Sequence, residues 1–450
     1  MRIRKITGGV LSLALGLSLL GLGAPPAAAD SSTELPVASH TDIVVDAAHQ
    51  RVFISDAVSG SVVVTDYDGT LVQHITSEPG ASGLVLSPDS STLYVALRTA
   101  DAISAIDTAT LRETARYATG PGTAPTYPAV AGGKIWFGYG TEAQGNIGWL
   151  DVSGPQPVVA LDRVGRTWYS APMLATSPGA PGRLVAGEVS TNPSQLAVYD
   201  VAGDFAQRTA YTVPSGGSVA DLAVTPDGSE VVVATGAPYY HRAFRLSDLT
   251  ESARYTTDAY PNAVAITQDG TAIAAGINGA YDPDIYLFRP GVDTQIRSYD
   301  FPSSSTNSTT LQPNGLAWAP DNSRLFALTK TYDSPTLTLR ILNDPAKTPT
   351  TLTLDAPATA AKSKRLTING TLRPADPAWP LPAGTTVRVT RYDYSLPEEG
   401  LDLGTHTIAP DGTFSFSDRP DYSGPIHYTV RYAGDPQHTA ATATAVVNVS

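Results

Sequence analysis

The side chains that most often perform catalysis are sparse in this sequence, and they do not follow a known catalytic spacing. The chain has seven histidines and no cysteine, which excludes disulfides, thiol nucleophiles and thiolate metal sites. No His-Glu-x-x-His, Gly-x-Ser-x-Gly or Walker-type pattern occurs. His241 is the one histidine in a predicted loop among tyrosines, and we interpret it as a surface or partly buried residue. The residues therefore predict no catalytic site and no cofactor.

One acidic pair is spaced for a hard cation. Asp282 and Asp284 flank Pro283, and carboxylates two residues apart can converge on Ca²⁺. The spacing of an EF-hand loop is absent, and Asp-Pro-Asp is also a good turn former. A calcium site and a plain turn both remain open here.

Aromatic residues in predicted loops form a second candidate site. Tyrosine outnumbers phenylalanine 21 to 9, and Tyr and Trp suit wet recognition surfaces because an apolar ring carries a hydrogen-bonding group. The candidate ligand-binding residues are Tyr127, Trp168, Tyr169, Tyr239, Tyr240, His241, Tyr260 and Tyr281. They either bind a glycan or protein, or pack between structural units, and the fold decides whether they share one face.

A repeated turn signal predicts the elements that position these residues. An apolar stretch, a Ser/Thr-Pro-Asp-Gly-like turn and a second apolar stretch recur, as in the segments around Asp89, Asp227, Asp269 and Asp321. With three weaker copies, the turns fall near residues 46, 89, 132, 178, 227, 269 and 321. Because Pro fixes φ and Asp-Gly suits the corner, each copy predicts a tight hairpin between two buried strands.

Two further strands complete each repeat. The third strand usually ends in an aspartate, as at Asp66, Asp107, Asp151 and Asp200, which we interpret as turn formers. Four strands per repeat of about 43 residues is the spacing of a propeller blade, and one blade cannot bury both faces alone. The pattern predicts a seven-bladed β-propeller over residues 38–346, in which the aromatic loops share one face.

With this pattern the chain resembles the YVTN-type β-propeller family. Leu93-Tyr94-Val95-Ala96 and Val232-Val233-Ala234-Thr235 are the nearest matches to the motif that names the family, and the preceding Ser/Thr-Pro-Asp-Gly hairpin is the more specific part. The resemblance implies a secreted or surface-displayed propeller and carries no specific catalytic residue.

The C-terminal part, residues 347–450, has a different pattern. Seven short alternating strands predict an immunoglobulin-like β-sandwich. The segment Tyr428–Asp435 and the hairpin Ala409–Phe414 resemble bacterial immunoglobulin-like repeat domains. That resemblance implies a stalk, spacer or adhesive module.

The N-terminus predicts export. Basic residues at 2, 4 and 5, an apolar run and Ala27-Ala28-Ala29 predict a Sec-type signal peptide over residues 1–29, cleaved after Ala29. Residues 30–37 are expected to be an N-terminal linker. No second apolar run is long enough to insert into a membrane.

The net negative charge of the chain makes some classes of binding partner less favourable. The formal net charge is −13, and an acidic surface argues against nucleic acid and anionic membranes as partners. We expect a secreted monomer that acts as a non-catalytic binding or cell-surface scaffold protein, with an extracellular glycan or protein as its partner. The alternatives are a secreted propeller hydrolase or lyase with a metal at the central channel, and a purely structural envelope protein.

Overall fold

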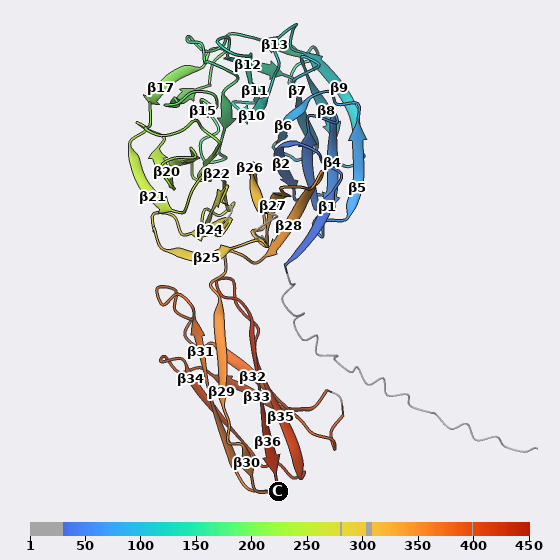
Figure 1. Ribbon diagram of the computed structural model, residues 1–450, viewed down its shortest axis with the longest axis vertical. Coiled ribbons are helices and arrows are strands. Elements are labelled where there is room, and N and C mark those ends of the chain that lie inside the picture. Colours follow the sequence, from blue (N-terminus) through green and yellow to red (C-terminus); the bar gives the residue numbers. More distant parts are fainter. Residues whose placement is uncertain (1–29, 280, 303–307, 398) are drawn as a thin grey trace, which may run out of the picture.

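The computed structural model describes residues 30–279, 281–302, 308–397 and 399–450. In these ranges all regular structure is β-strand (Figure 1). No described segment forms a helix long and apolar enough to cross a bilayer. The predicted signal peptide lies outside the described residues and stays a prediction.

Among the described residues of the range 31–343, seven four-stranded sheets follow one another, and their neighbouring strands pair antiparallel. Figure 1 shows them arranged in a ring. The strands of the first three sheets are β2 (His40–Asp46), β3 (Arg51–Asp56), β4 (Ser61–Asp66), β5 (Leu71–Thr76), β6 (Ala81–Leu86), β7 (Thr92–Leu97), β8 (Ala102–Asp107), β9 (Arg112–Ala118), β10 (Tyr127–Ala131), β11 (Lys134–Tyr139), β12 (Asn146–Asp151) and β13 (Val158–Ala160).

The remaining four sheets repeat the same order, except that the last takes one strand from the start of the chain. Their strands are β14 (Met173–Ala175), β15 (Arg183–Gly187), β16 (Leu196–Asp200), β17 (Gln207–Thr212), β18 (Asp221–Val224), β19 (Glu230–Ala234), β20 (Tyr240–Arg245), β21 (Glu251–Thr256), β22 (Pro261–Ile266), β23 (Ile273–Ile277), β24 (Ile285–Phe288), β25 (Gln295–Tyr299), β26 (Thr309–Trp318), β27 (Arg324–Thr331), β28 (Leu337–Asn343) and β1 (Ser31–Leu35).

The predicted hairpins lie where the turn signal places them, between the first and second strands of each sheet. Asp227 shows why the signal works. Its Oδ1 accepts hydrogen bonds from the Thr225 hydroxyl at 2.6 Å and the Ser229 backbone N–H at 3.0 Å. The side chain thus satisfies turn groups that the sheet ladder leaves unpaired.

The aspartates that end the third strands form turns as predicted. Asp107 Oδ1 accepts hydrogen bonds from the backbone N–H and hydroxyl of Thr110 at 2.7 and 2.6 Å. Equivalent local bonds form at Asp66, Asp151 and Asp200. These carboxylates are therefore occupied by turn chemistry.

The ring closes through strand β1. Residues 30–37 were expected to be a linker, but Ser31–Leu35 pairs antiparallel with β28, in register from Ser31↔Ile341 to Leu35↔Leu337. Figure 1 shows β1 beside β28. The strand is mostly polar because its outer position leaves one face in solvent, so its hydropathy pattern does not distinguish it from a linker.

Each first strand contacts the first strand of the next sheet, from β2 through β26 and back to β2. Apolar side chains fill the space between neighbouring sheets, as where Phe53 and Val64 pack in one cluster with Leu93 and Val95. Burying one such side chain stabilises the fold by about 1.5–3 kcal/mol. We call residues 31–343 the ring domain.

Residues 350–449 form two sheets that enclose a separate core. The strands are β29 (Thr350–Asp355), β30 (Thr359–Ala360), β31 (Leu366–Pro374), β32 (Thr386–Tyr392), β33 (Leu401–Thr407), β34 (Thr413–Asp418), β35 (Gly424–Tyr432) and β36 (Ala441–Val449). One sheet has the order β29-β31-β34 and the other β30-β36-β35-β32-β33. We call this part the C-terminal domain.

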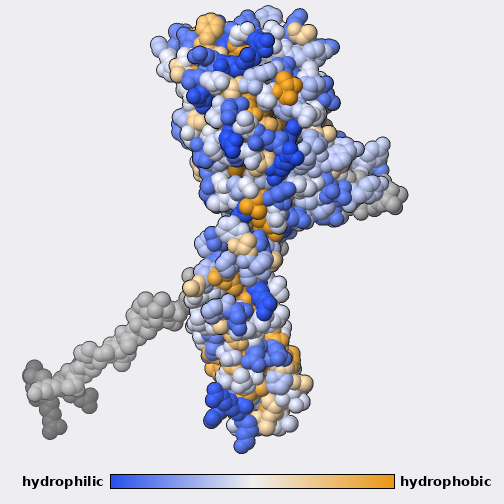
Figure 2. Space-filling view, turned by 90° about the vertical axis from the view of Figure 1, so that its left-hand side faces the viewer, coloured by the Kyte–Doolittle hydropathy of each residue, from blue (hydrophilic) through white to orange (hydrophobic). Residues whose placement is uncertain are grey.

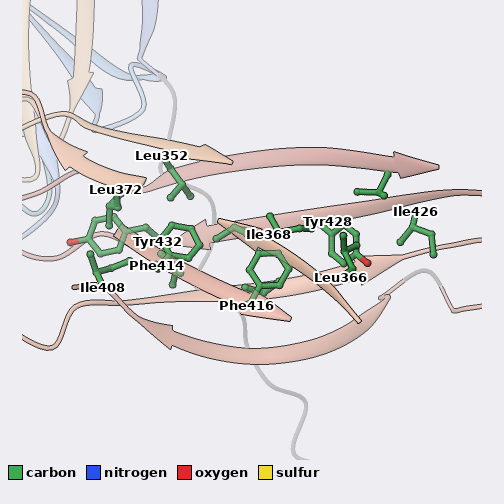
Figure 3. Packing of buried hydrophobic residues seen from close by; sticks show 14 of the residues in the cluster. Leu352, Leu366, Ile368, Leu372, Ile408, Phe414, Phe416, Ile426, Tyr428 and Tyr432 are labelled. Carbon is green, nitrogen blue, oxygen red and sulfur yellow. The ribbon is translucent and has the colours of Figure 1, made fainter. Parts of the chain in front are cut away.

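Alternating burial along these strands builds the core of the C-terminal domain. Ile368 and Phe416 from the three-stranded sheet pack with Ile426 and Tyr428 from the five-stranded sheet (Figure 3). The buried ring of Tyr428 keeps its hydroxyl satisfied by donating to Asp418 at 2.8 Å. This agrees with the strand alternation in the sequence.

The two domains meet at a narrow junction (Figure 2). The Arg289 guanidinium, directly after β24, donates to the carbonyl of Ala346 at 3.1 Å and stacks on the ring of Trp379. The Trp379 carbonyl in turn contacts His438 Nε2 at 3.0 Å. The junction therefore has side-chain contacts as well as the covalent connection.

Candidate functional site

A pocket of about 430 Å³ lies on the face of the ring domain formed by the loops between second and third strands and the segments that enter the first strands. It spans three consecutive sheets, from the β7–β8 loop to the β15–β16 loop. Its lining residues are Arg98, Thr126, Tyr127, Gly140, Thr141, Glu142, Tyr169, Ser170, Ala171, Val189 and Ser190. Two of the predicted aromatic residues, Tyr127 and Tyr169, thus meet in one pocket.

Hydrogen bonds to two glutamates hold the loop that carries Tyr169. The Tyr169 hydroxyl donates to the Glu142 carboxylate. Its backbone N–H donates to Glu188 Oε2 at 2.9 Å, and the Ser170 hydroxyl donates to Glu188 Oε1 at 3.2 Å. Glu188 is fully buried, so it acts as a support under the pocket.

Arg98 is the cation of the pocket. Its backbone N–H donates to the Gly80 carbonyl at 3.0 Å, which holds its main chain in place. Its side chain is exposed, and no hydrogen bond or ion pair joins the guanidinium to any residue in the described part of the chain. Arg98 and Glu188 were not predicted as site residues. Nothing in the local sequence separates them from ordinary loop and strand-end charges.

A second aromatic group lies on loops of the fifth and sixth sheets. Tyr239 and Tyr260 are half exposed, and their ring centroids are 5.3 Å apart in an edge-to-face arrangement. Tyr281 is 97% exposed, and Tyr240 is turned toward the outer strand, with the Arg254 guanidinium 4.9 Å from its ring centroid. The predicted aromatic set therefore divides into two groups.

Two of the predicted residues belong to the interior instead. Trp168 is 5% exposed and packs in a cluster of apolar residues. His241 is not in a loop but in strand β20, where it is fully buried and its Nε2 contacts the Ala263 carbonyl at 3.0 Å. Burial lowers the pKa of His241 to about 4. The sequence placed them beside loop tyrosines, but Trp168 pairs with Gly145 in an isolated β-bridge and His241 belongs to β20, and both side chains are buried.

Asp282 and Asp284, the predicted calcium pair, differ in their surroundings. Asp284 is 2% exposed, its Oδ2 accepts the Phe301 backbone N–H at 2.8 Å, and burial raises its pKa to about 7. Asp282 is partly exposed. Among the described residues there is no group of three His, Cys, Asp or Glu side chains spaced to hold a metal ion. A calcium site here stays a prediction.

Two carboxylates on first strands tie neighbouring sheets together. Asp221 Oδ2 accepts the Val264 backbone N–H of the next sheet at 2.7 Å, and Asp42 Oδ2 accepts the Leu84 backbone N–H in the same way at 2.7 Å. In both cases Oδ1 accepts the N–H of the following residue. Desolvation raises the pKa of Asp42 to about 7 and the pKa of Asp221 well above its usual value. The local bonding makes these groups structural ties.

Comparisons with known proteins support the fold and go no further. No protein-family model matches the sequence, and no curated protein matches it significantly. Among solved structures, the β-propeller domain of Myceliophteria thermophila Cps50 (Swd1) aligns with a TM-score of 0.54 and 13% identity, covering 69% of this chain and 99% of that one.

Hydrazine synthase from Kuenenia stuttgartiensis also aligns, with a TM-score of 0.54 and 16% identity, over 68% of this chain and 96% of that one. Identities this low carry the fold but not the function. Together with the four-stranded sheets, these likenesses show that the chain contains a β-propeller.

Proposed function

We propose that this is a secreted, non-catalytic binding or cell-surface scaffold protein. In this proposal the ring domain is a seven-bladed propeller of the YVTN type, and the C-terminal domain is an immunoglobulin-like spacer. One propeller face is the platform for an extracellular glycan or protein. The single observation that carries the proposal is the convergence of Tyr127 and Tyr169 on a pocket that also holds Arg98, whose guanidinium has no partner in the described part of the chain.

The geometry of the pocket favours binding over catalysis. A pocket of about 430 Å³ is within the range of small-molecule sites. Glu142 and Glu188 accept hydrogen bonds from Tyr169, which supports a role for both carboxylates in holding the pocket loop. A metal-dependent hydrolase or lyase is the less supported alternative, because Asp42 and Asp221 are occupied by backbone N–H groups.

Binding of the protein to cell-wall glycans, plant glycans and extracellular proteins tests the proposal. The double variant Tyr127→Ala/Tyr169→Ala should lose at least about tenfold in affinity for the ligand that wild type captures, because aromatic contacts dominate such sites. Tyr394→Ala is the matched control, since this tyrosine is 85% exposed on the C-terminal domain. If the double variant folds and still binds every ligand with the affinity of wild type, the face that carries Tyr127 and Tyr169 is not the binding platform.

Thermal unfolding with and without EDTA tests the alternative. A ligand that binds only the folded state raises the midpoint of unfolding. A glycan that raises it equally in EDTA supports the binding proposal. A lowered midpoint in EDTA, restored by calcium, would favour the metal-dependent alternative and direct attention to Asp282.

A further inference from the structure

We propose that the pocket around Arg98 binds a saccharide that carries a carboxylate, such as a uronic acid residue. The inference rests on the proposed function, since it names the ligand class of the same pocket. Four kinds of observation support it: the unpaired guanidinium, the engaged carboxylates beside it, the two tyrosines, and the hydroxyl groups along one wall.

The guanidinium of Arg98 is available for a ligand. Two other exposed arginines of the ring domain are paired: Arg116 with Glu113, and Arg254 with Glu251. Within the described residues no such partner reaches the Arg98 side chain. Its charge acts on the nearby hydroxyl of Tyr127, lowering the pKa of that group against the larger effect of burial. Arg98 and Tyr127 are therefore close enough to act on one ligand.

The acidic groups near the pocket do not neutralise Arg98. Glu142 accepts the Tyr169 hydroxyl, and Glu188 accepts the Tyr169 and Ser190 backbone N–H groups. Neither lies within ion-pair distance of Arg98. The pocket thus has one unpaired cation with five N–H donors in a planar fork, which matches a carboxylate in two parallel hydrogen bonds.

The remaining walls suit a sugar. Tyr127 and Tyr169 offer aromatic surface for the C–H faces of a pyranose ring. Thr141, Ser170 and Ser190 line the pocket. The Ser170 and Ser190 hydroxyls are hydrogen-bonded to each other at 2.6 Å, and each hydroxyl oxygen keeps a lone pair that can accept a hydrogen bond from a sugar hydroxyl. An acidic peptide would find the same arginine but no apolar depression for side chains, because Ala171 and Val189 are the only aliphatic side chains of the described lining.

The net negative charge of the whole protein repels anionic ligands. With a formal net charge of −13, the long-range field repels an acidic ligand. Affinity for a carboxylate must then come from a local cation, and this makes Arg98 the residue on which discrimination depends. A neutral saccharide would not depend on it.

Titration calorimetry with the full-length mature chain tests the inference. The probes are trigalacturonate, a glucuronate-containing disaccharide and an N-acetylmuramic acid disaccharide, each paired with its methyl ester, which keeps the sugar and removes the charge. We expect wild type to bind at least one acid more tightly than its ester. Arg98→Ala should weaken that binding by more than about tenfold, because a charge-assisted bidentate contact is lost. Arg98→Lys should restore only part of it.

Arg112→Ala is the matched control, because Arg112 is an exposed arginine of the same sheet that lies outside the pocket; its affinity should equal that of wild type. The inference is overturned if wild type binds none of the three acids, binds acid and ester equally, or loses nothing in Arg98→Ala. If neutral saccharides bind and Tyr127→Ala/Tyr169→Ala abolishes that binding, the proposed function stands and only the carboxylate is wrong. Failure of wild type to bind any glycan or protein of the wider panel would instead reject the proposed function.

Discussion

The Arg289 guanidinium lies 4.4 Å from the centroid of the Trp379 ring, and this pair joins the propeller to the C-terminal domain. Arg289 also donates to the carbonyls of Thr271 and Ala346, so its orientation is fixed from the propeller side. Arg289 is only 8% exposed. A contact of this kind holds two domains in one arrangement beyond the covalent linker.

Removing this contact should loosen the two domains without unfolding either. We expect Trp379→Ala to increase the radius of gyration in small-angle X-ray scattering and to speed proteolysis between residues 343 and 350, because a partly buried cation–π contact is worth about 0.5–2 kcal/mol. Arg388→Ala, which removes a solvent-exposed ion pair with Asp402 on the C-terminal domain, should change neither. Identical scattering for all three proteins would mean that the linker alone sets the arrangement.

Much of the fold follows from turn chemistry that can be read in the sequence. The side chains of Asp107 and Asp227 bond to their own turns, and such local bonds depend only on residues close in sequence. Strand β1 could not be found in that way, because its pairing with β28 joins residues some 300 positions apart and its outer position tolerates polar residues.

The candidate site was predictable only in part. Tyr127 and Tyr169 were found because aromatic residues near predicted loops are a compositional signal, although Tyr127 is the first residue of strand β10. Arg98 carries no such signal, since its importance comes from the absence of a partner in three dimensions. Burial of Trp168 and His241 depends on the direction in which the backbone presents each side chain, and element boundaries that are uncertain by one residue cannot fix that direction.

Strand β1 should be essential to the stability of the ring. Leu35 is 2% exposed and packs with residues of the first and last sheets. We expect Leu35→Ala to lower the free energy of unfolding by about 2–5 kcal/mol, because the substitution leaves a cavity at the closure. Glu34→Ala, at a more exposed position of the same strand, should change it by less than about 0.5 kcal/mol. Urea denaturation measures both; equal midpoints would show that the ring does not depend on this closure.

Asp42 should make stability fall as the pH rises. Burial raises its pKa to about 7, so the folded state holds the proton more tightly than the unfolded state. Its contribution is then largest below about pH 4 and is lost as the pH rises to about 7. We expect Asp42→Asn to remove on the order of 1–3 kcal/mol of this dependence.

Denaturation at pH 5 and pH 8 in wild type and Asp42→Asn isolates this effect. Asp284 contributes in the same direction, with a pKa of about 7, while the buried His40, with a pKa lowered to about 4, acts in the opposite direction. The contributions of Asp284 and His40 cancel in the difference between the two proteins. The charge of Asp42 also helps to raise the pKa of Asp221, so the difference includes this coupled part of the Asp221 titration. An unchanged pH dependence in Asp42→Asn would assign the effect to other groups.

Trp168 and Tyr281 should respond oppositely to substitution, although both belong to the predicted aromatic set. Trp168 is 5% exposed and its indole packs between the third and fourth sheets, whereas Tyr281 is 97% exposed. We expect Trp168→Ala to lower the free energy of unfolding by about 3–5 kcal/mol, because a large side chain leaves a cavity. Tyr281→Ala should leave it within about 0.5 kcal/mol of wild type.

Ligand binding separates the two variants further. Trp168 immediately precedes Tyr169. If Trp168→Ala loses affinity and its unfolding midpoint is also lowered, Trp168 acts indirectly, by holding the loop that carries Tyr169. A loss of affinity in Tyr281→Ala at an unchanged midpoint reports direct contact with the ligand and extends the binding face to the sixth sheet. If Tyr281→Ala binds as wild type does, the binding face is confined to the sheets around Tyr127 and Tyr169.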